Sequence, residues 1–207
     1  MLKHFRFSKK LGLQKNIINL FFWFFIVQTI FYFSNQKIDH PYFLGIMSLL
    51  SAAALAAPYL IYSLTSLHKK LNSRFLTTLE TIIIFMLLIG WLGTWGLYYA
   101  VSGYDSFVHF FTSFLGTLVV FIVISSFKDL VNKPRIFIIL FLLISAYGIF
   151  NEFFQHYGDR WWQTTMSGEA GQPYDSYRDV VYNTLGIFLG IAVAYLKGNT
   201  IISRLSI

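Results

Sequence analysis

Six long apolar segments dominate this sequence, and each is long enough to cross a lipid bilayer. They are residues 17–34, 41–64, 79–100, 106–127, 136–156 and 180–197. At about 1.5 Å of rise per residue, helices of this length span a hydrocarbon core of about 30 Å. No segment alternates like a barrel strand, and an open sheet edge in lipid would lack hydrogen-bond partners. The sequence therefore predicts an all-α, polytopic bundle of six transmembrane helices, in which residues 1–207 form a single transmembrane domain.

The composition excludes the common soluble classes. Hydrophobic residues make up 56% of the chain and charged residues only 12%, whereas a soluble domain carries about 25% charged residues. So few charges cannot cover a water-facing surface, which excludes a soluble globular enzyme and a nucleic-acid-binding domain. The sequence contains no cysteine, so disulfides and zinc–thiolate sites are also excluded.

The basic residues predict the orientation of the chain. Thirteen of the sixteen lysines and arginines lie before the first segment, in the second and fourth loops, or at and after the end of the sixth segment. The other three are Lys37, Arg160 and Arg178. Because positive charge collects on the cytoplasmic side, we expect both termini in the cytoplasm (N-in, C-in) and residues 157–179 in an outward-facing loop. The net charge of +7 then reflects topology and anionic headgroups, and no nucleic-acid partner is expected.

Polar side chains are concentrated in the last three segments, as three pairs spaced four residues apart. The pairs are Asp105 with His109, Glu152 with His156, and Asp179 with Asn183. This spacing puts both members of a pair on one helix face. Since the fourth and sixth segments run inward and the fifth runs outward, all three pairs lie at similar depth in the outer part of the membrane. Asp175 lies one helical turn above Asp179.

Carboxylates crowded in a membrane need a compensating cation, because burial of unpaired charge is costly. Mixed imidazole and carboxylate donors suit a divalent metal such as Zn²⁺, Mn²⁺ or Fe²⁺ better than Ca²⁺. The expected metal ligands are His109, Glu152, His156 and Asp179. The candidate catalytic residues are Asp105, Glu152, Asp175 and Asn183. Asp105 or Asp175 would complete the metal shell or act as a base, and Asn183 would orient a ligand or polarise the substrate.

A metal-dependent hydrolase is the function that these residues favour, with a membrane lipid or lipid-linked envelope molecule as its substrate. Arg160 and Arg178 would bind a substrate phosphate, and residues 157–178 would form a lid. An ion- or proton-coupled transporter is the alternative, and a non-catalytic protein that binds a lipid or drug is a third. The sequence leaves the oligomeric state open.

Smaller features carry structural expectations. Gly90, Gly93 and Gly96 in the third segment predict a close helix approach, and the pair Gly186 and Gly190 predicts packing within the bundle. Glu80 lies near the cytoplasmic end of the third segment, where we expect it to be solvated.

The polar residues also resemble a family pattern. The series Tyr104-Asp105…His109, Asn151-Glu152, and Asp175…Asp179…Asn183…Gly186 resembles the VanZ-like membrane proteins, and more closely the inner-membrane family typified by YjdF. The likeness covers residues 103–196. It implies a polytopic protein of a bacterial or archaeal plasma membrane, and a role in the cell envelope would suit the outward-facing pocket. VanZ-like members are associated with glycopeptide resistance without an agreed reaction. The resemblance therefore implies no particular reaction.

Overall fold

The computed structural model describes residues 9–127, 133–162 and 174–206, and nearly all of them are helical. The elements are α1 (Lys9–Ser34), α2 (Pro41–Leu64), η1 (Ser66–Lys69), α3 (Ser73–Leu92), η2 (Gly93–Leu97), α4 (Tyr98–Ala100), α5 (Tyr104–Phe127), α6 (Pro134–Trp162) and α7 (Asp175–Leu205). With η2 and α4 counted as the end of the α3 span, six helices are long and apolar enough to cross a membrane. This confirms the predicted all-α, six-helix fold.

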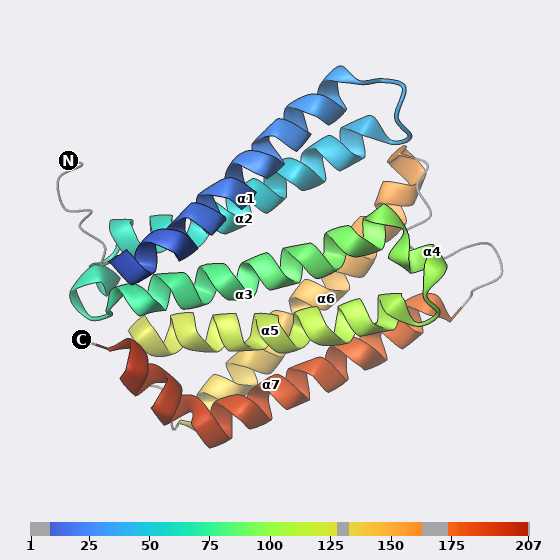
Figure 1. Cartoon of the computed structure of the whole chain (residues 1–207). Helices are drawn as coiled ribbons and strands as arrows, with labels where there is room; N and C mark the ends of the chain where they lie inside the picture. Colours follow the sequence, from blue (N-terminus) through green and yellow to red (C-terminus); the bar gives the residue numbers. More distant parts are fainter. Residues whose placement is uncertain (1–8, 128–132, 163–173, 207) are drawn as a thin grey trace.

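The six spans form one bundle, in which α3, α5 and α7 lie side by side and α6 crosses behind them (Figure 1). The α1–α2 hairpin packs along α3. The contact between α5 and α7 is the most extensive in the bundle. Helix α1 begins and α7 ends at the same end of the molecule (Figure 1), as the even number of spans requires.

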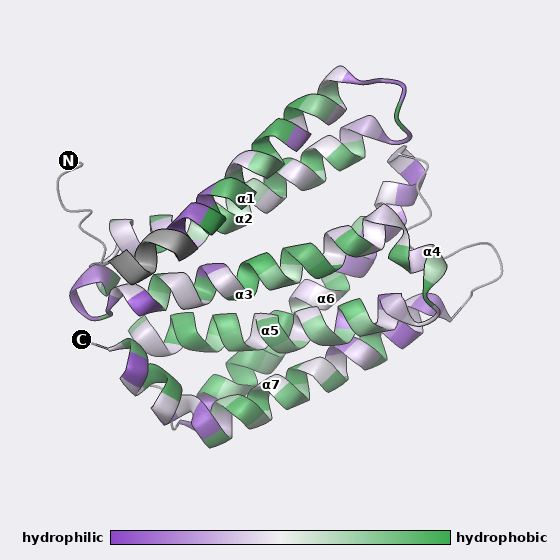
Figure 2. Cartoon of the chain, viewed as in Figure 1, coloured by the Kyte–Doolittle hydropathy of each residue, from purple (hydrophilic) through white to green (hydrophobic). Residues whose placement is uncertain are grey.

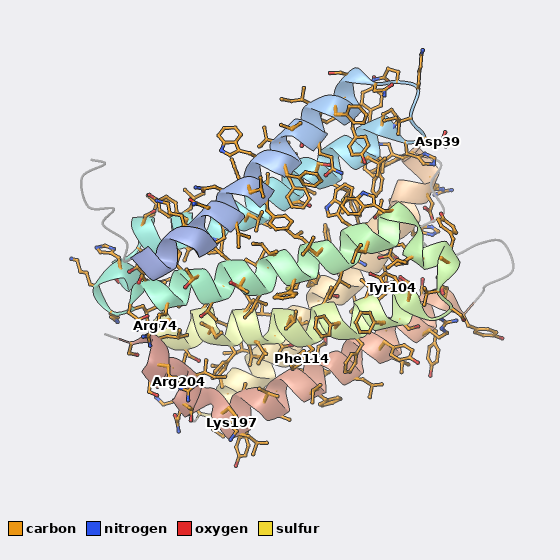
Figure 3. The ribbon with its side chains drawn as sticks, viewed as in Figure 1. Asp39, Arg74, Tyr104, Phe114, Lys197 and Arg204 are labelled. Atoms are coloured by element: carbon orange, nitrogen blue, oxygen red, sulfur yellow. The ribbon has the colours of Figure 1, made fainter. Side chains whose placement is uncertain are left out.

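Charge divides the bundle into two different ends. Apolar residues cover the middle of the helices, and hydrophilic residues gather towards the ends (Figure 2). Arg74, Lys197 and Arg204 lie at the end where α7 finishes, and Asp39 lies at the opposite end (Figure 3). We call these the basic end and the acidic end. The basic end is the one that we expect to face the cytoplasm.

Two helices run further than the apolar segments suggested. Helix α6 continues past His156 to Trp162, and α7 starts at Asp175, so the ends of the expected loop 157–179 are helical. Aromatic side chains four residues apart support the extension, because Tyr157 stacks on Phe153 and also contacts Trp161. Residues 163–173 of that loop, which make up half of the proposed lid, lie outside the described residues.

The apolar core lies nearer the basic end. Its largest cluster joins α3, α5, α6 and α7 through buried side chains that include Phe75, Leu79, Phe121, Ile136 and Leu140. A second cluster joins α1, α2 and α3. Helices α5 and α7 therefore meet through apolar side chains near the basic end, which leaves their other halves for small and polar residues.

Small residues bring α5 and α7 into close contact. A side chain on Gly186 would overlap the backbone carbonyl of Phe110, and a Cβ on Gly190 would lie 2.6 Å from the Cβ of Thr117. Both glycines are buried in the helix interface. This confirms that the pair packs within the bundle.

The glycines of the third segment do not lie at a contact between two helices. Nothing lies within 4 Å of a Cβ placed on Gly90 or Gly96, and a Cβ on Gly93 would overlap the ring of Tyr98, five residues later in the chain. Gly96 has a φ of 127°, a backbone conformation that residues other than glycine rarely adopt. The expectation of close helix approach was wrong, and Gly93 and Gly96 lie in a break at the end of α3.

Glu80 is buried rather than solvated. Only 7% of the residue is exposed, although it lies about 10 Å from the start of α3 at about 1.5 Å per residue. Its charge interacts with that of Lys15 on α1. The prediction that Glu80 is solvated was wrong, because the position of a residue along a helix does not show whether its side chain faces the solvent or another helix, here α1.

Candidate functional site

Two helices bring an aspartate, a histidine and a second aspartate together at the acidic end. Asp105 and His109 come from the first turns of α5, and Asp179 comes from the second turn of α7. The Nε2 atom of His109 lies 3.6 Å from Oδ1 of Asp105 and 3.5 Å from Oδ2 of Asp179. We call these three residues the Asp–His–Asp site.

Local sequence explains why α5 presents its pair to α7. Gly103, with a φ of 78°, turns the chain into α5. Asp105 then stands in the first turn, where the helix dipole favours a negative charge. The i, i+4 spacing puts His109 on the same face, and the close contact at Gly186 holds α7 against that face.

The site is buried and leaves polar atoms unsatisfied. Asp179 is 2% exposed and His109 6% exposed. The Oδ1 atom of Asp179 is buried and accepts no hydrogen bond from the residues that the structure describes. Such an atom normally has a partner, because a buried acceptor without one is costly. This oxygen is therefore able to accept a hydrogen bond or to bind a cation.

The separations of the ligand atoms suit a metal ion. One ligand atom from each of Asp105, His109 and Asp179 lies within 4.8 Å of the others. Ligands at about 2.1 Å around a tetrahedral ion are about 3.4 Å apart, close to the two measured separations from His109. Two carboxylates and one imidazole also offer the mixed oxygen and nitrogen donors that Zn²⁺, Mn²⁺ and Fe²⁺ bind.

Glu152 lies beside this group without belonging to it. It comes from α6, and both of its carboxylate oxygens are buried without a hydrogen-bond partner among the described residues. Its charge interacts with those of His109, Asp105 and Asp175. The structure thus groups Asp105, rather than Glu152, with the other two candidate ligands. Glu152 remains a nearby carboxylate, close to the Ser176 hydroxyl in the first turn of α7.

Asn183 lies one turn deeper than Asp179 and joins three helices. Its Oδ1 atom accepts a hydrogen bond of 2.6 Å from the Ser113 hydroxyl on α5. On α6, a Cβ at Gly148 would lie 3.2 Å from its Nδ2 atom. Asn183 is therefore placed to hold α5, α6 and α7 in register below the site.

The remaining candidates occupy the rim or lie outside the group. Asp175 is half-buried at the start of α7. The exposed Arg178 donates a hydrogen bond of 3.0 Å from Nη2 to the Ser106 hydroxyl. His156 and Arg160 are exposed on α6, and the ring of His156 contacts its neighbour Tyr157. Neither His156 nor Arg160 joins the Asp–His–Asp site.

Sequence reasoning gave no role to Ser106. A serine one residue after Asp105 carries no distinguishing signal in the sequence, because its link to Arg178 depends on how α5 and α7 are paired. Ser113 is different, since it lies four residues after His109 and so continues the polar face of α5.

Comparisons with known proteins place the chain in a membrane family. No curated protein and no solved structure matches it. A family model described as predicted membrane protein (DUF2238) matches residues 17–199. That range takes in most of the chain, including the Asp–His–Asp site, Glu152 and Asn183. The chain therefore belongs to the DUF2238 family of membrane proteins.

Proposed function

We propose that this protein is a divalent-metal-dependent hydrolase of a prokaryotic plasma membrane, acting on a lipid or lipid-linked envelope molecule. The observation that carries the proposal is the convergence of Asp105, His109 and Asp179 from two helices into one buried group. A soluble active site is excluded by the six apolar spans, so the substrate must reach the acidic end of a membrane bundle.

A bound cation would resolve the electrostatics of the site. Two carboxylates within 4.8 Å of each other repel strongly in a weakly polar environment. A Zn²⁺, Mn²⁺ or Fe²⁺ ion held by Asp105, His109 and Asp179 would offset this repulsion. When bound, such an ion supplies an activated water molecule and polarises a phosphoryl or acyl oxygen.

The residues around the metal ligands have complementary roles in this proposal. Glu152, with two unpartnered carboxylate oxygens, would accept a proton from the attacking water. Arg178 would bind a substrate phosphate at the rim, where it now contacts Ser106. Asn183 would hold α5 and α7 in register through Ser113.

The distribution of charge supports an outward-facing site. The acidic end carries the Asp–His–Asp site, and the basic end carries Arg74, Lys197 and Arg204. With the basic end in the cytoplasm, both termini lie inside and the site faces the envelope. The order of the polar residues also supports a finer kinship to YjdF-type and VanZ-like proteins, which would suit an envelope role.

Metal content tests the first half of the proposal. We expect about one equivalent of metal in the detergent-purified wild type by plasma mass spectrometry, and loss of that metal in His109→Ala and Asp179→Asn. His156→Ala is the matched control, because this histidine is exposed and outside the group. A folded wild type that stays metal-free after incubation with Zn²⁺, Mn²⁺ and Fe²⁺ would rule the proposal out.

Lipid turnover tests the second half. Metal-loaded protein in nanodiscs of total bacterial lipid should change the mass of at least one lipid species. Glu152→Gln should keep the metal and lose most of the turnover, about 100-fold or more for removal of a general base. A metal-loaded protein that leaves every lipid intact would point to non-catalytic binding.

Glu80 favours ion- or proton-coupled transport as a second candidate function. A transporter needs polar groups towards both faces, and a buried carboxylate inside a span often marks an ion or proton path. Glu80 is such a group on the basic side of α3. A proton flux into proteoliposomes that is abolished in both Glu80→Gln and Asp179→Asn would favour this function over hydrolysis.

A further inference from the structure

We propose that the basic end contains a binding site for a phosphate group, from the headgroup of an anionic lipid or free in solution. The site is a cavity between the residues just before α3, the end of α5 and the end of α7. These three parts of the chain meet at the basic end (Figure 1). The cavity lies at the opposite end of the bundle from the Asp–His–Asp site, so the inference is independent of the proposed hydrolysis.

Hydroxyl groups and an ammonium group line this space, which we call the basic-end cavity. Its volume is about 240 Å³, several times the space that one water molecule needs. Lys70 and Leu71 come from the chain between η1 and α3, residues 125–127 come from the last turn of α5, and Ile202 and Ser206 come from the end of α7. The cavity is therefore large enough for a group of several heavy atoms.

Hydrogen bonds hold the walls of the cavity in place. Leu71 and Ser206 form an isolated antiparallel β-bridge. The Nδ2 atom of Asn72 donates to the carbonyls of Arg204 and Ser206, at 3.1 Å each. The backbone N–H of Asn72 donates to the carbonyl of Leu205 at 2.9 Å. Three carbonyls at the negatively polarised end of α7 are thereby occupied, which leaves fewer of them to attract a cation.

Ser125 gives the wall of the cavity a buried hydroxyl without a partner. Serine and threonine hydroxyls within helices often donate to the carbonyl four residues earlier, and Thr117 and Ser126 on α5 do so at 2.7 and 2.6 Å. The Oγ atom of Ser125 is buried and has no hydrogen bond with any residue that the structure describes. Only 5% of Ser125 is exposed. An acceptor atom in the cavity would therefore satisfy a group that is costly to leave unpaired.

Positive charge around the cavity favours an anion as its occupant. Lys70 is exposed and lines the cavity. Arg74 and Arg204 lie at the same end of the bundle (Figure 3). Asn72 connects the two arginines, because its Oδ1 atom accepts from the backbone N–H of Arg74 at 2.9 Å and its Nδ2 atom donates to the carbonyl of Arg204. A negative ligand in the cavity would thus have cationic groups on more than one side.

The available donors suit a phosphate group. The hydroxyls of Ser126 and Ser206 donate to carbonyls of their own helices. Among the described side chains of the lining, this leaves the hydroxyl of Ser125 and the ammonium group of Lys70 to donate to a ligand. A phosphate offers several acceptor oxygens, so it can accept from both at once. The cavity lies where the spans end, which is the level of lipid headgroups in a bilayer.

The test measures binding to the full-length, detergent-purified protein in two arms. In the first arm, native mass spectrometry follows the titration with phosphatidylglycerol. In the second arm, the ³¹P NMR line width of inorganic phosphate is followed as protein is added. We expect saturable binding in at least one arm, and the arm that shows it identifies the source of the phosphate.

Two variants remove the donors, and each has a matched control. Ser125→Ala should weaken binding about 10-fold, because it removes a hydrogen bond to a charged acceptor. Lys70→Gln should weaken it about 3- to 10-fold. Ser203→Ala removes an exposed α7 hydroxyl that donates to the carbonyl of Thr200. Lys69→Gln removes the exposed neighbouring lysine, which is not part of the described lining. Both controls should bind within about 2-fold of the wild type.

Ser125→Ala separates a bound phosphate from a general attraction of lipid to positive charge, because it leaves every charge unchanged. Its loss of affinity should persist in about 0.5 M NaCl, which screens exposed charges. Equal affinity in the wild type and Ser125→Ala would overturn the inference, as would the absence of saturable binding in both arms.

Thermal unfolding without phosphate checks that the Ser125 hydroxyl is free. Ser125→Ala should unfold at the wild-type temperature or above it, since it removes an unsatisfied buried group. A lower unfolding temperature would show that the hydroxyl has a structural partner, and would also contradict the inference.

Discussion

Asn183 shows how a buried amide can hold helices together in a membrane. Its Oδ1 atom accepts from Ser113, and Gly148 leaves room for its Nδ2 atom on α6. Lipid offers no substitute hydrogen-bond partner for the Ser113 hydroxyl or for the Asn183 amide oxygen, so each depends on the other. The pair lies directly below Asp179, so a shift of α7 along α5 would disturb the hydrogen bond and the Asp–His–Asp site together.

We expect Ser113→Ala to lower the free energy of unfolding by about 1 kcal/mol, because Asn183 loses the donor to its Oδ1 atom. Asn183→Ala should cost at least as much, and the double variant little more than Asn183→Ala alone. Unfolding in mixed detergent micelles measures these values. The control is Thr184→Ala, whose hydroxyl bonds to Val180 of its own helix. Fully additive losses would contradict a direct Ser113–Asn183 interaction.

At the scale of elements, α5 and α7 act as one unit because their backbones approach closely. Gly186 faces the carbonyl of Phe110, and Gly190 faces Thr117 and the carbonyl of Phe114. Side chains larger than hydrogen would force the helices apart. The contact between α5 and α7 has a polar end, which forms the site, and an apolar end, which joins the core cluster around Phe121.

Gly186→Ala should destabilise the protein by about 1–3 kcal/mol, as expected for an overpacked interface. It should also weaken metal binding, since it moves Asp179 away from His109. Gly116→Ala is the matched control on α5, because the nearest atoms to its Cβ lie at 3.8 Å. Thermal unfolding and metal content measure both effects. A Gly186→Ala protein with wild-type stability would contradict the close contact described for this helix pair.

The sequence predicts the helices better than their interruptions. Length and hydropathy identify the six spans, because each must satisfy its own backbone in lipid. The i, i+4 spacing likewise predicts that Asp105 and His109 share a face. Hydropathy also predicts one continuous helix over residues 79–100, and it does not reveal the break at Gly96. Glycine permits a positive φ without requiring it, so this break becomes visible only in three dimensions.

At the scale of the whole molecule, the α1–α2 hairpin is joined to the rest of the bundle at both ends. Near the basic end, the charges of Glu80 on α3 and Lys15 on α1 interact. At the acidic end, Nδ1 of His40 lies 2.8 Å from the carbonyl of Trp162, which links the start of α2 to the end of α6. Sequence periodicity could not predict either interaction, because each depends on how distant helices are paired.

We expect Lys15→Met to destabilise the protein by about 1–3 kcal/mol, because it leaves a buried carboxylate without its nearby positive charge. Adding Glu80→Gln should recover most of that loss. Lys37→Met, in the exposed α1–α2 loop, serves as the control for removing a lysine. Chemical unfolding of the four proteins measures the effect. Equal losses in Lys15→Met and in the double variant would contradict the pairing.

The pairing of α5 with α7 also sets an order of events during synthesis. Ser113 and Asn183 are 70 residues apart, so at about 5–20 residues per second the ribosome needs roughly 4–14 s to travel from one to the other. During that interval α5 has Asp105, His109 and Ser113 on one face and no α7 to cover them. The nascent chain must therefore keep this face against the insertion machinery, or in contact with water, until the partner helix emerges.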